Sequence, residues 1–262
     1  MVDIHSHFLP GIDDGAQSAE QSMSMVQMAW RHGTKILVAS PHADVQFRYD
    51  PDNVDRLLDE ARAAAPAGIR LVRACDFHLM ADNIEAALHH PARYTIDGKC
   101  YLLMELSDLT IFANTSDLWS RLEDAGMRII LTHPERNPLL RQRIELIEQW
   151  VSQGRYMQLT ASSLLGLFGP KALAFSRLLL DRGLAHFVAS DAHDLRSRPP
   201  RLDLAYQWLS SHYSEELARL LCVDHPLAAV DGAPLDLSSF PPSPASPKPS
   251  FLRRLLGRRS DS

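Results

Sequence analysis

The stretch Met1-Val-Asp-Ile-His5-Ser-His7 sets a pattern that recurs along the chain: a run of apolar residues that ends in histidine or a carboxylate. The pattern returns in Ile36-Leu-Val-Ala-Ser-Pro-His42, Tyr101-Leu-Leu-Met-Glu105, Ile129-Ile-Leu-Thr-His133 and Phe187-Val-Ala-Ser-Asp191-Ala-His193, and more weakly in Ile69-Arg-Leu-Val-Arg-Ala-Cys-Asp76. Apolar runs of this length, bounded by turn residues, predict buried strands. Metal-binding residue types at the end of strand after strand are typical of a barrel that gathers a metal site at one mouth.

Helix-type segments separate these strands. After the first strand, further strands are expected at 35–39, 69–75, 100–105, 128–132, 155–160 and 185–190. Helices are expected from the capping box Ser18-Ala-Glu-Gln21 to Gly33, and at 51–65, 82–89, 115–125, 141–153, 170–182, 201–211 and 214–221. Seven strand-then-helix units imply parallel strands joined by right-handed crossovers.

We therefore expect an α/β fold whose strands form a closed or nearly closed barrel. An open doubly wound sheet is the alternative. The barrel is preferred because ligand candidates follow strands one to five and strand seven. In an open sheet, neighbouring strands lie about 4.8 Å apart, so the outer strands would be too distant to share one site.

The composition excludes several classes of protein. The chain has 262 residues, 45% of them hydrophobic, which suffices for a full core in one barrel or two smaller domains. Its net charge of −5 argues against a nucleic-acid-binding surface, and we expect no nucleic-acid partner. Cys75, Cys100 and Cys222 form no Cys-x-x-Cys pair, so a cytoplasmic protein without thiolate zinc is expected. No apolar run reaches the roughly 18–20 residues of a membrane span, and no signal peptide is recognised.

The composition changes near residue 236. Phe240-Pro-Pro-Ser-Pro-Ala-Ser-Pro-Lys-Pro predicts an extended, disordered linker, and the basic, apolar segment Phe251-Leu-Arg-Arg-Leu-Leu-Gly-Arg-Arg follows it. We expect one domain over residues 1–232 and a tail over 233–262. The basic segment could make a peripheral contact with an anionic membrane or dock onto a partner. A solvated tail without a role is the alternative.

Two histidines stand two residues apart in the first strand. His5 and His7 would point the same way, so both could reach one metal ion, although a hydrogen-bonded pair is the alternative. Asp3 is expected on that same side, where it could orient a ligand. The Asp13-Asp14-Gly15 stretch that follows is most often only a turn, but here we expect Asp14 to face the metals.

The remaining ligand candidates follow later strands. His42 is a lone histidine after the second strand. Burying an unpaired carboxylate is unfavourable, so Glu105 is expected to meet a metal or cation, with a structural salt bridge as the alternative. His133 follows the fifth strand, and Asp191 and His193 again place two ligand types two residues apart.

Two arginines accompany these candidates. Arg136 and Arg198 could each bind a phosphate group bidentately, whereas ordinary surface ion pairs are the alternative. Histidine and carboxylate ligands without thiolate suit Zn, Mn or Fe. Two or three such ions beside an arginine suit hydrolysis at phosphorus. The other histidines, His78 among them, are expected to be structural or solvated.

Together these motifs resemble the PHP (polymerase and histidinol phosphatase) superfamily, over about residues 1–230. They are Asp3-Ile-His-Ser-His-Phe-Leu-Pro-Gly-Ile-Asp-Asp-Gly15, Pro41-His42, Glu105-Leu106, Thr132-His-Pro-Glu-Arg136 and Ser190-Asp-Ala-His193 with Arg198-Pro-Pro. Within that superfamily the chain looks most similar to the manganese-dependent tyrosine-protein phosphatases of bacterial capsule and exopolysaccharide loci.

The resemblance implies a distorted (β/α)7 barrel with a trinuclear metal site at its C-terminal mouth. Up to three divalent ions, Mn²⁺ first and Fe or Zn as alternatives, would be held by His5, His7, His42, Asp76, Glu105, His133, Asp191 and His193, with Asp14 close by. Arg136 and Arg198 would bind the phosphate. The family usually carries glutamate where this chain has Asp76, and the shorter side chain would alter a bridging geometry or hold that metal more loosely.

The implied activity is removal of phosphate from the phosphotyrosine tail of a bacterial tyrosine autokinase that controls capsule or exopolysaccharide synthesis. A PHP phosphoesterase acting on a small phosphomonoester such as histidinol phosphate is the first alternative. A metal-poor regulatory binding module is the second. No cysteine is followed six residues later by arginine, so the cysteine-nucleophile route to phosphotyrosine hydrolysis is absent.

Overall fold

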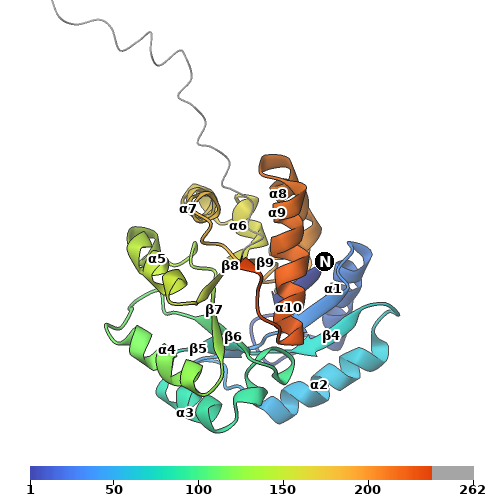
Figure 1. The fold of residues 1–262 in the computed structure, drawn as a ribbon. Helices are drawn as coiled ribbons and strands as arrows, with labels where there is room; N and C mark the ends of the chain where they lie inside the picture. The colour runs from blue at the N-terminus through green and yellow to red at the C-terminus, as the bar shows by residue number, and fades with distance from the viewer. Residues whose placement is uncertain (238–262) are drawn as a thin grey trace, which may run out of the picture.

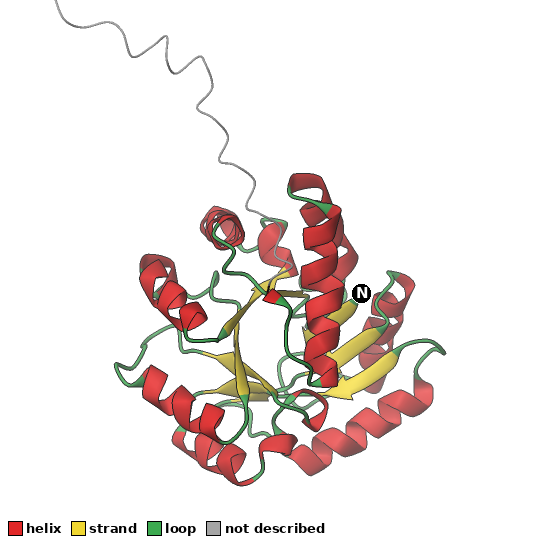
Figure 2. Ribbon diagram, in the orientation of Figure 1, coloured by secondary structure: helices red, strands yellow, loops and turns green. Residues whose placement is uncertain are grey.

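The computed structural model describes residues 1–237, in which parallel strands form a central barrel inside a ring of helices (Figures 1 and 2). The strands, in chain order, are β1 (Val2–Ser6), β2 (Ile36–Ala39), β3 (His42–Ala43), β4 (Arg70–Arg73), β5 (Asp76–His78), β6 (Tyr101–Glu105), β7 (Arg128–Thr132), β8 (Tyr156–Thr160) and β9 (Phe187–Ala189). They form two sheets, of order β1-β2-β4 and β3-β5-β6-β7-β8-β9.

The two sheets are parts of one closed arrangement. β3 continues the path of β2, and β5 continues that of β4, so the chain makes seven passes through the barrel. The ring closes where a parallel bridge joins Ser6 to Ala192 and the His7 N–H donates to the Ala192 carbonyl at 2.8 Å. The expected seven-unit parallel barrel is therefore confirmed, and the open sheet is excluded.

The barrel is distorted where its second and third passes are interrupted. Strands were expected without a break at 35–39 and 69–75, but pairing resumes beyond those ranges, with His42 opposite Asp76 in β3 and β5. Pro41 lies in the first gap, and proline cannot donate a ladder hydrogen bond. The short strands β3 and β5 therefore hold His42 and Asp76 within the sheet rather than in the loops that follow it.

The helices lie where the apolar periodicity predicts them, with two additions. They are α1 (Ala19–Arg31), α2 (Pro51–Ala64), α3 (Ala81–His89), α4 (Thr115–Asp124), α5 (Ile144–Ser152), α6 (Ala161–Leu164), α7 (Gly169–Asp181), α8 (Leu202–His212), α9 (Glu215–Arg219) and α10 (His225–Asp231). Short 3₁₀ turns occupy Pro91–Arg93, Ile96–Gly98 and Leu140–Gln142. The single turn α6 is too short to show periodicity. A π turn over Leu220–Asp224 extends α9 into α10, beyond the expected end at 221.

Local signals explain where the first helices begin. The Ser18 hydroxyl accepts the Gln21 N–H, as the capping box predicts. Asp50 caps α2, and Pro51 occupies its first turn. Backbone N–H groups in the first turn of a helix have no partner within the helix, so proline, which lacks an N–H, is tolerated there.

Two layers of side chains form the core because strand residues alternate between the barrel interior and the helices. Val38, Val72, Leu103, Ile130 and Phe187 come from five strands and belong to one buried cluster inside the barrel. The neighbouring strand residues Leu102, Met104, Leu131 and Leu159 pack outward with helix residues such as Trp119 of α4 and Leu179 of α7. This double packing fixes the directions in which the strand ends present their polar side chains.

The segment after α10 packs against the N-terminal end of the barrel. The Tyr101 hydroxyl donates to the Ala233 carbonyl at 2.7 Å and accepts a bond from Arg128 at 3.1 Å. Leu235 packs on the interior cluster. Residues 238–262, which include the proline-rich and basic segments of the predicted tail, lie outside the described residues. Within residues 1–237, no helix combines the length and the apolar character needed to traverse a bilayer.

Truncation tests where the folded unit ends. A chain that ends at Leu237 is expected to unfold at the same temperature as the full chain. A chain that ends at Gly232 loses the acceptor of Tyr101 and the packing of Leu235, so it is expected to lose about 1–3 kcal/mol of stability. Thermal unfolding followed by circular dichroism measures both. Equal unfolding temperatures for all three chains would contradict this account of the C-terminal segment.

Candidate metal centre

Histidines and carboxylates from six of the seven passes meet at the C-terminal ends of the strands. The eight ligand candidates and Asp14 lie together there, linked by contacts between side-chain nitrogen and oxygen atoms of 3.1–3.8 Å. Most are buried: His5 and Asp76 are 0% exposed, and Asp191 is 1% exposed. Three overlapping groups can be distinguished within this cluster.

The first group surrounds the two histidines of β1. Nε2 of His5 lies 3.1 Å from Nε2 of His7. Asp191 Oδ1 lies 3.4 Å from the first and 3.5 Å from the second, and Asp76 Oδ2 lies 3.5 Å from His5 Nε2. These four side chains therefore converge on one small volume.

The second and third groups lie to either side of His42. Asp76 Oδ2 is 3.1 Å and Glu105 Oε2 is 3.7 Å from His42 Nδ1, and His133 Nε2 is 3.8 Å from the other oxygen of Glu105. Asp14 Oδ1 lies 3.3 Å from His42 Nε2 and 3.2 Å from Nε2 of His193. Asp76 belongs to both the first and the second group, so it occupies a bridging position.

The backbone is strained where two of these side chains leave their strands. His133 has a φ of 34° and Asp191 a φ of 51°, in the left-handed region that residues other than glycine rarely adopt. Each follows the end of a strand, β7 or β9. Such strain costs about 1–3 kcal/mol and persists only where the surrounding structure imposes it, most often at functional sites.

Hydrogen bonds hold three histidine rings with one nitrogen toward the cluster. Nδ1 of His5 donates to the Gln158 side-chain oxygen at 2.8 Å, and Nδ1 of His7 donates to Asp13 at 2.7 Å. Nδ1 of His193 lies 3.0 Å from the Asp191 carbonyl. With the proton on Nδ1, each Nε2 presents a lone pair. Two such lone pairs 3.1 Å apart repel each other unless a cation lies between them.

Unpartnered buried atoms also fit a metal site. Among the described residues, both carboxylate oxygens of Asp76, Nδ1 of His42 and Nε2 of His193 are buried without a hydrogen bond of good geometry. A buried carboxylate without partners is strongly unfavourable unless it binds a cation. Four sets of three or four side chains have ligand atoms close enough to share one ion. Two of these sets fall within the first and second groups, and a third adds His7 to the third group. The residues present therefore fit bound divalent ions.

The electrostatics of the cluster favour positive charge. Burial lowers the pKa of His5, but Asp76 and Asp191 outweigh it and raise that pKa to about 9. Burial also lowers the pKa of His42, but Asp14 and Asp76 raise it to about 12. Burial raises the pKa of Asp76, yet the adjacent imidazoles hold it well below its usual range. The pKa values of Asp14 and Asp191 are lowered as well, whereas burial and the neighbouring Asp76 raise the pKa of Glu105. The three ionised aspartates create a negative potential that attracts cations.

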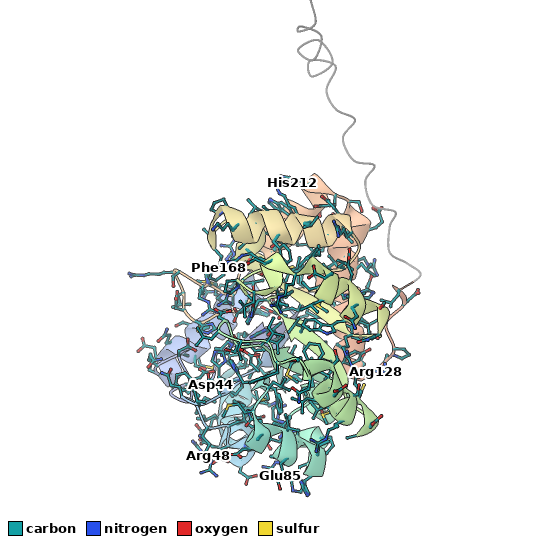
Figure 3. All side chains as sticks on the ribbon, turned by 90° about the vertical axis from the view of Figure 1, so that its left-hand side faces the viewer. Asp44, Arg48, Glu85, Arg128, Phe168 and His212 are labelled. Atoms are coloured by element: carbon teal, nitrogen blue, oxygen red, sulfur yellow. The ribbon has the colours of Figure 1, made fainter. Side chains whose placement is uncertain are left out.

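Two arginines and an aromatic ring lie at one side of the cluster. Arg136 and Arg198 both donate to Oδ2 of Asp191. The Arg136 guanidinium lies 4.5 Å from the centre of the Phe168 ring, and that of Arg198 lies 5.9 Å from it. Figure 3 places Phe168 on the opposite side of the molecule from Arg128, the first residue of β7. The arginines thus border the metal cluster at the C-terminal mouth.

The loop that carries Asp13 and Asp14 packs directly on β1. A Cβ atom added at Gly15 would lie 1.9 Å from the His7 carbonyl oxygen and 2.5 Å from its Cβ. The Gly15 N–H donates to Asp13 at 2.9 Å. Glycine is required here by this close approach, which lets Asp13 reach the His7 ring and Asp14 reach His42.

Gly15→Ala is therefore expected to displace the loop, lower stability by about 1–3 kcal/mol and reduce the number of bound metal ions. Gly11→Ala is the matched control, since Gly11 lies in the same loop with a φ of +71° and open space around it. That variant should lose stability through backbone strain but keep its metal. Thermal unfolding and elemental analysis measure the two effects. An unchanged metal content in Gly15→Ala would contradict the role given to the loop.

Several residues of the site were not singled out from the sequence. Gln158 and Phe168 lacked any local signal, because each acts on side chains distant in the chain. Asp13 lies in the Asp13-Asp14-Gly15 stretch, but Asp14 was favoured there, and the contact of Asp13 with His7 was not predicted. His78 was expected to be structural or solvated, but its Nε2 lies 2.8 Å from Glu105 Oε2. Its place two residues after Asp76 on one strand was the available signal.

The expectation for Asp3 is not met. The pairing of β1 with β2 shifts register between Asp3 and Ser6, so simple alternation fails across this segment. The buried Asp3 carboxylate accepts the Ser190 N–H at 2.9 Å instead of bonding a metal-facing ring. Burial raises its pKa. Asp3 thus ties β1 to the chain after β9 and supports the closure of the barrel.

The sequence of this chain is similar to that of known proteins. Residues 1–231 match the family described as capsular polysaccharide synthesis, CpsB/CapC. The chain belongs to this family. A putative tyrosine-protein phosphatase CapC of Staphylococcus aureus is 32% identical to this CpsB/CapC member over 221 residues, 82% of this chain and 86% of that protein. The tyrosine-protein phosphatase YwqE of Bacillus subtilis is 30% identical over 230 residues, 84% of this chain and 88% of that protein.

Solved structures show the same relationship. One from work on YwqE of B. subtilis and CpsB of Streptococcus pneumoniae, described as unique metal-dependent tyrosine phosphatases, superposes with a TM-score of 0.83. It is 28% identical and covers 90% of this CpsB/CapC chain and 96% of its own. A phosphotriesterase homology protein of Escherichia coli, at 12% identity and a TM-score of 0.55, covers 86% of this chain and 96% of its own. That likeness extends to the fold alone.

Proposed function

We propose that this CpsB/CapC member is a metal-dependent phosphatase that hydrolyses phosphotyrosine in proteins. The observation that carries the proposal is the convergence of eight histidine and carboxylate side chains, with Asp14 at their edge, beside two arginines. Its relatives CapC and YwqE are named tyrosine-protein phosphatases, and a structure of this kind is described as metal-dependent.

The proposed ligand assignment follows the three groups. His5, His7 and Asp191 would hold the first ion with Asp76, and Asp76 would bridge to a second ion held by Glu105 and His133. His42 and His193 would hold the third, close to Asp14. Nitrogen and oxygen ligands without thiolate suit manganese, which we propose as the metal. The negative potential of the ionised acids supports up to three divalent ions.

The roles of the chain's own residues follow from their positions. Divalent ions, when bound, activate water and offset the charge of the phosphate group. Arg136 and Arg198 lie where they can bind the remaining phosphate oxygens and stabilise charge that develops during transfer. Asp191 orients both guanidiniums. Asp13 and Gln158 hold His7 and His5 in the tautomers that leave Nε2 free.

Phe168 is expected to position the two arginines. Phe168→Ala removes the ring beneath them, and a cation–π contact of about 0.5–2 kcal/mol predicts a loss of roughly two- to thirtyfold in kcat/KM on an aryl phosphate. Phe168→Tyr keeps the ring and should retain activity. The neighbouring Leu167→Ala is the matched control, since Leu167 is 64% exposed. If Phe168→Ala is as active as Leu167→Ala, the ring has no such role.

The proposed substrate is a tyrosine-phosphorylated protein, specifically the phosphotyrosine tail of a bacterial tyrosine autokinase that controls capsule or exopolysaccharide synthesis. Such a tail lies in the cytoplasm, which is the location that we propose for this protein. The basic segment near residues 251–259 is proposed to make a peripheral contact with a membrane or partner.

Substrate comparison tests the proposal. The protein, purified without chelator and assayed with Mn²⁺, should hydrolyse phosphotyrosine peptides with a higher kcat/KM than histidinol phosphate. The reverse order would favour the small-molecule phosphoesterase. Less than about one metal ion per chain, with no hydrolysis of either substrate, would favour a regulatory binding module. Anomalous scattering at the Mn, Fe and Zn edges of a crystal would identify and count the ions.

A further inference from the structure

A groove leads away from the metal cluster on the side opposite to the arginines. Its first part, here called the near pocket, encloses about 430 Å³ between the loops that follow β3, β5 and β6. His78 and Glu105, which border the metal cluster, line this pocket, together with Asp44, Ser107 and Phe112. The near pocket therefore opens directly from the candidate active site.

The second part, here called the far pocket, lies between α3 and α4 and encloses about 880 Å³. Its lining is largely apolar and includes Ile84, Leu88 and Leu118, whereas Glu85 and Arg121 provide polar groups. Leu79, Met80 and Phe112 line both pockets, so the two adjoin each other. In Figure 3, Glu85 of α3 lies toward the lower end of the molecule, beyond Asp44.

Exposed apolar side chains gather around the same mouth. Val45 and Leu109 are each 90% exposed, Phe112 is 54% exposed and Leu167 is 64% exposed. Val45, Leu109 and Phe112 lie on loops that follow β3 and β6, and Leu167 lies between α6 and α7. Only Leu227 and Leu237 join them as large exposed apolar residues among residues 1–237. Apolar groups concentrated in this way, next to polar ones, mark a surface that binds another molecule.

We propose that this groove binds the polypeptide segment next to the phosphotyrosine of the substrate, with a bulky apolar side chain of that segment in the far pocket. The inference rests on the proposed function and adds a specificity-determining surface to it. A small phosphate ester would fill only the space beside the metals and leave the groove empty. A polypeptide must continue beyond its phosphotyrosine, and the near pocket lies between the proposed active site and the apolar far pocket.

Phe112 is the residue best placed to test this inference. It lines both pockets, and its exposure means that truncation does not open the core. Phe112→Ala should lower kcat/KM roughly tenfold on peptides that carry leucine beside the phosphotyrosine, because it removes part of the apolar wall against which the leucine side chain would be buried. It should leave hydrolysis of p-nitrophenyl phosphate unchanged. Phe112→Tyr keeps the ring and should behave like the parent chain.

Two further variants separate the groove from general effects. Leu227→Ala is the matched control, because Leu227 is an exposed apolar residue on α10 that lines neither pocket. This variant should change the kcat/KM on neither the leucine-containing peptides nor p-nitrophenyl phosphate. Ala81→Trp places a large ring in the far pocket from an exposed position at the start of α3. It should lower the kcat/KM on leucine-containing peptides as Phe112→Ala does, by blocking the groove.

The experiment compares short phosphotyrosine peptides whose flanks are glycine and serine with peptides that carry leucine on either flank. The parent chain should prefer the leucine peptides, and Phe112→Ala and Ala81→Trp should abolish the preference. Equal kcat/KM on both peptide types in the parent chain would overturn the groove assignment while phosphotyrosine hydrolysis itself stands. Hydrolysis of p-nitrophenyl phosphate but of no phosphotyrosine peptide would overturn the proposed function and this inference with it. If the groove variants change the sedimentation of the protein but not peptide kinetics, a second copy of the chain occupies the groove and the proposal fails.

Discussion

Asp191→Asn should reduce phosphate release from an aryl phosphate by about a thousandfold, the largest effect that we expect from a single substitution. The carboxylate is buried, lies 3.4–3.5 Å from the Nε2 atoms of His5 and His7, and accepts from Arg136 and Arg198. Its loss removes a proposed metal ligand. It also leaves two guanidiniums without the charge that orients them, and both effects act on the reacting group.

Asparagine is the informative replacement at this position. Asp191 has a φ of 51°, and asparagine tolerates this left-handed conformation better than alanine does. The variant therefore keeps the backbone and the shape of the side chain and removes mainly the charge. Asp203→Asn is the matched control, because Asp203 also pairs with an arginine, Arg201, at 2.8 Å but lies away from the cluster. Near-normal turnover in Asp191→Asn, with the fold intact by circular dichroism, would refute the site.

Asp76→Asn is expected to remove at least one bound metal ion per chain and to lower activity by about a hundredfold or more. Asp76 is 0% exposed, neither of its oxygens has a hydrogen-bond partner, and it lies between His5 and His42 at 3.5 and 3.1 Å. Only this carboxylate belongs to both the first and the second ligand group. A neutral amide cannot bridge two cations in the same way.

Asp76→Glu separates charge from shape at this position. Glutamate keeps the negative charge and adds one methylene, so we expect it to retain more metal than the asparagine variant. Elemental analysis of the purified proteins gives the ion count, and kcat on p-nitrophenyl phosphate gives the activity. If Asp76→Asn binds as much metal as the parent chain, Asp76 is not a bridging ligand and the three-ion assignment is wrong.

Much of this fold follows from local sequence patterns. Apolar runs such as Ile129–Leu131 and helix periodicity are short-range properties, so they predict the seven passes and most of the helices. The interruption before Asp76 was not predicted, because it depends on which neighbouring strand pairs with which residue. The register shift beyond Asp3 has the same cause: a bulge arises from pairing between strands.

The candidate site divides in the same way. Residue types at strand ends were sufficient to select His5, His133 and Asp191, because parallel strands of a barrel bring their C-terminal ends to one mouth. The partners that make those residues functional were not predictable. Gln158 reaches His5 across 153 positions of sequence, and Phe168 lies beneath arginines from two other loops.

The amino-acid sequence by itself therefore determined the order of strands and helices, the chemical types of the proposed ligands and the family resemblance. Only the tertiary structure decided which nitrogen of each histidine faces the cluster, which carboxylate lies between two groups of candidate ligands, and where a groove leaves the site. The physical reason is that these properties depend on hydrogen bonds and close contacts between residues distant in the chain. Such contacts come into being only when the barrel closes between Ser6 and Ala192.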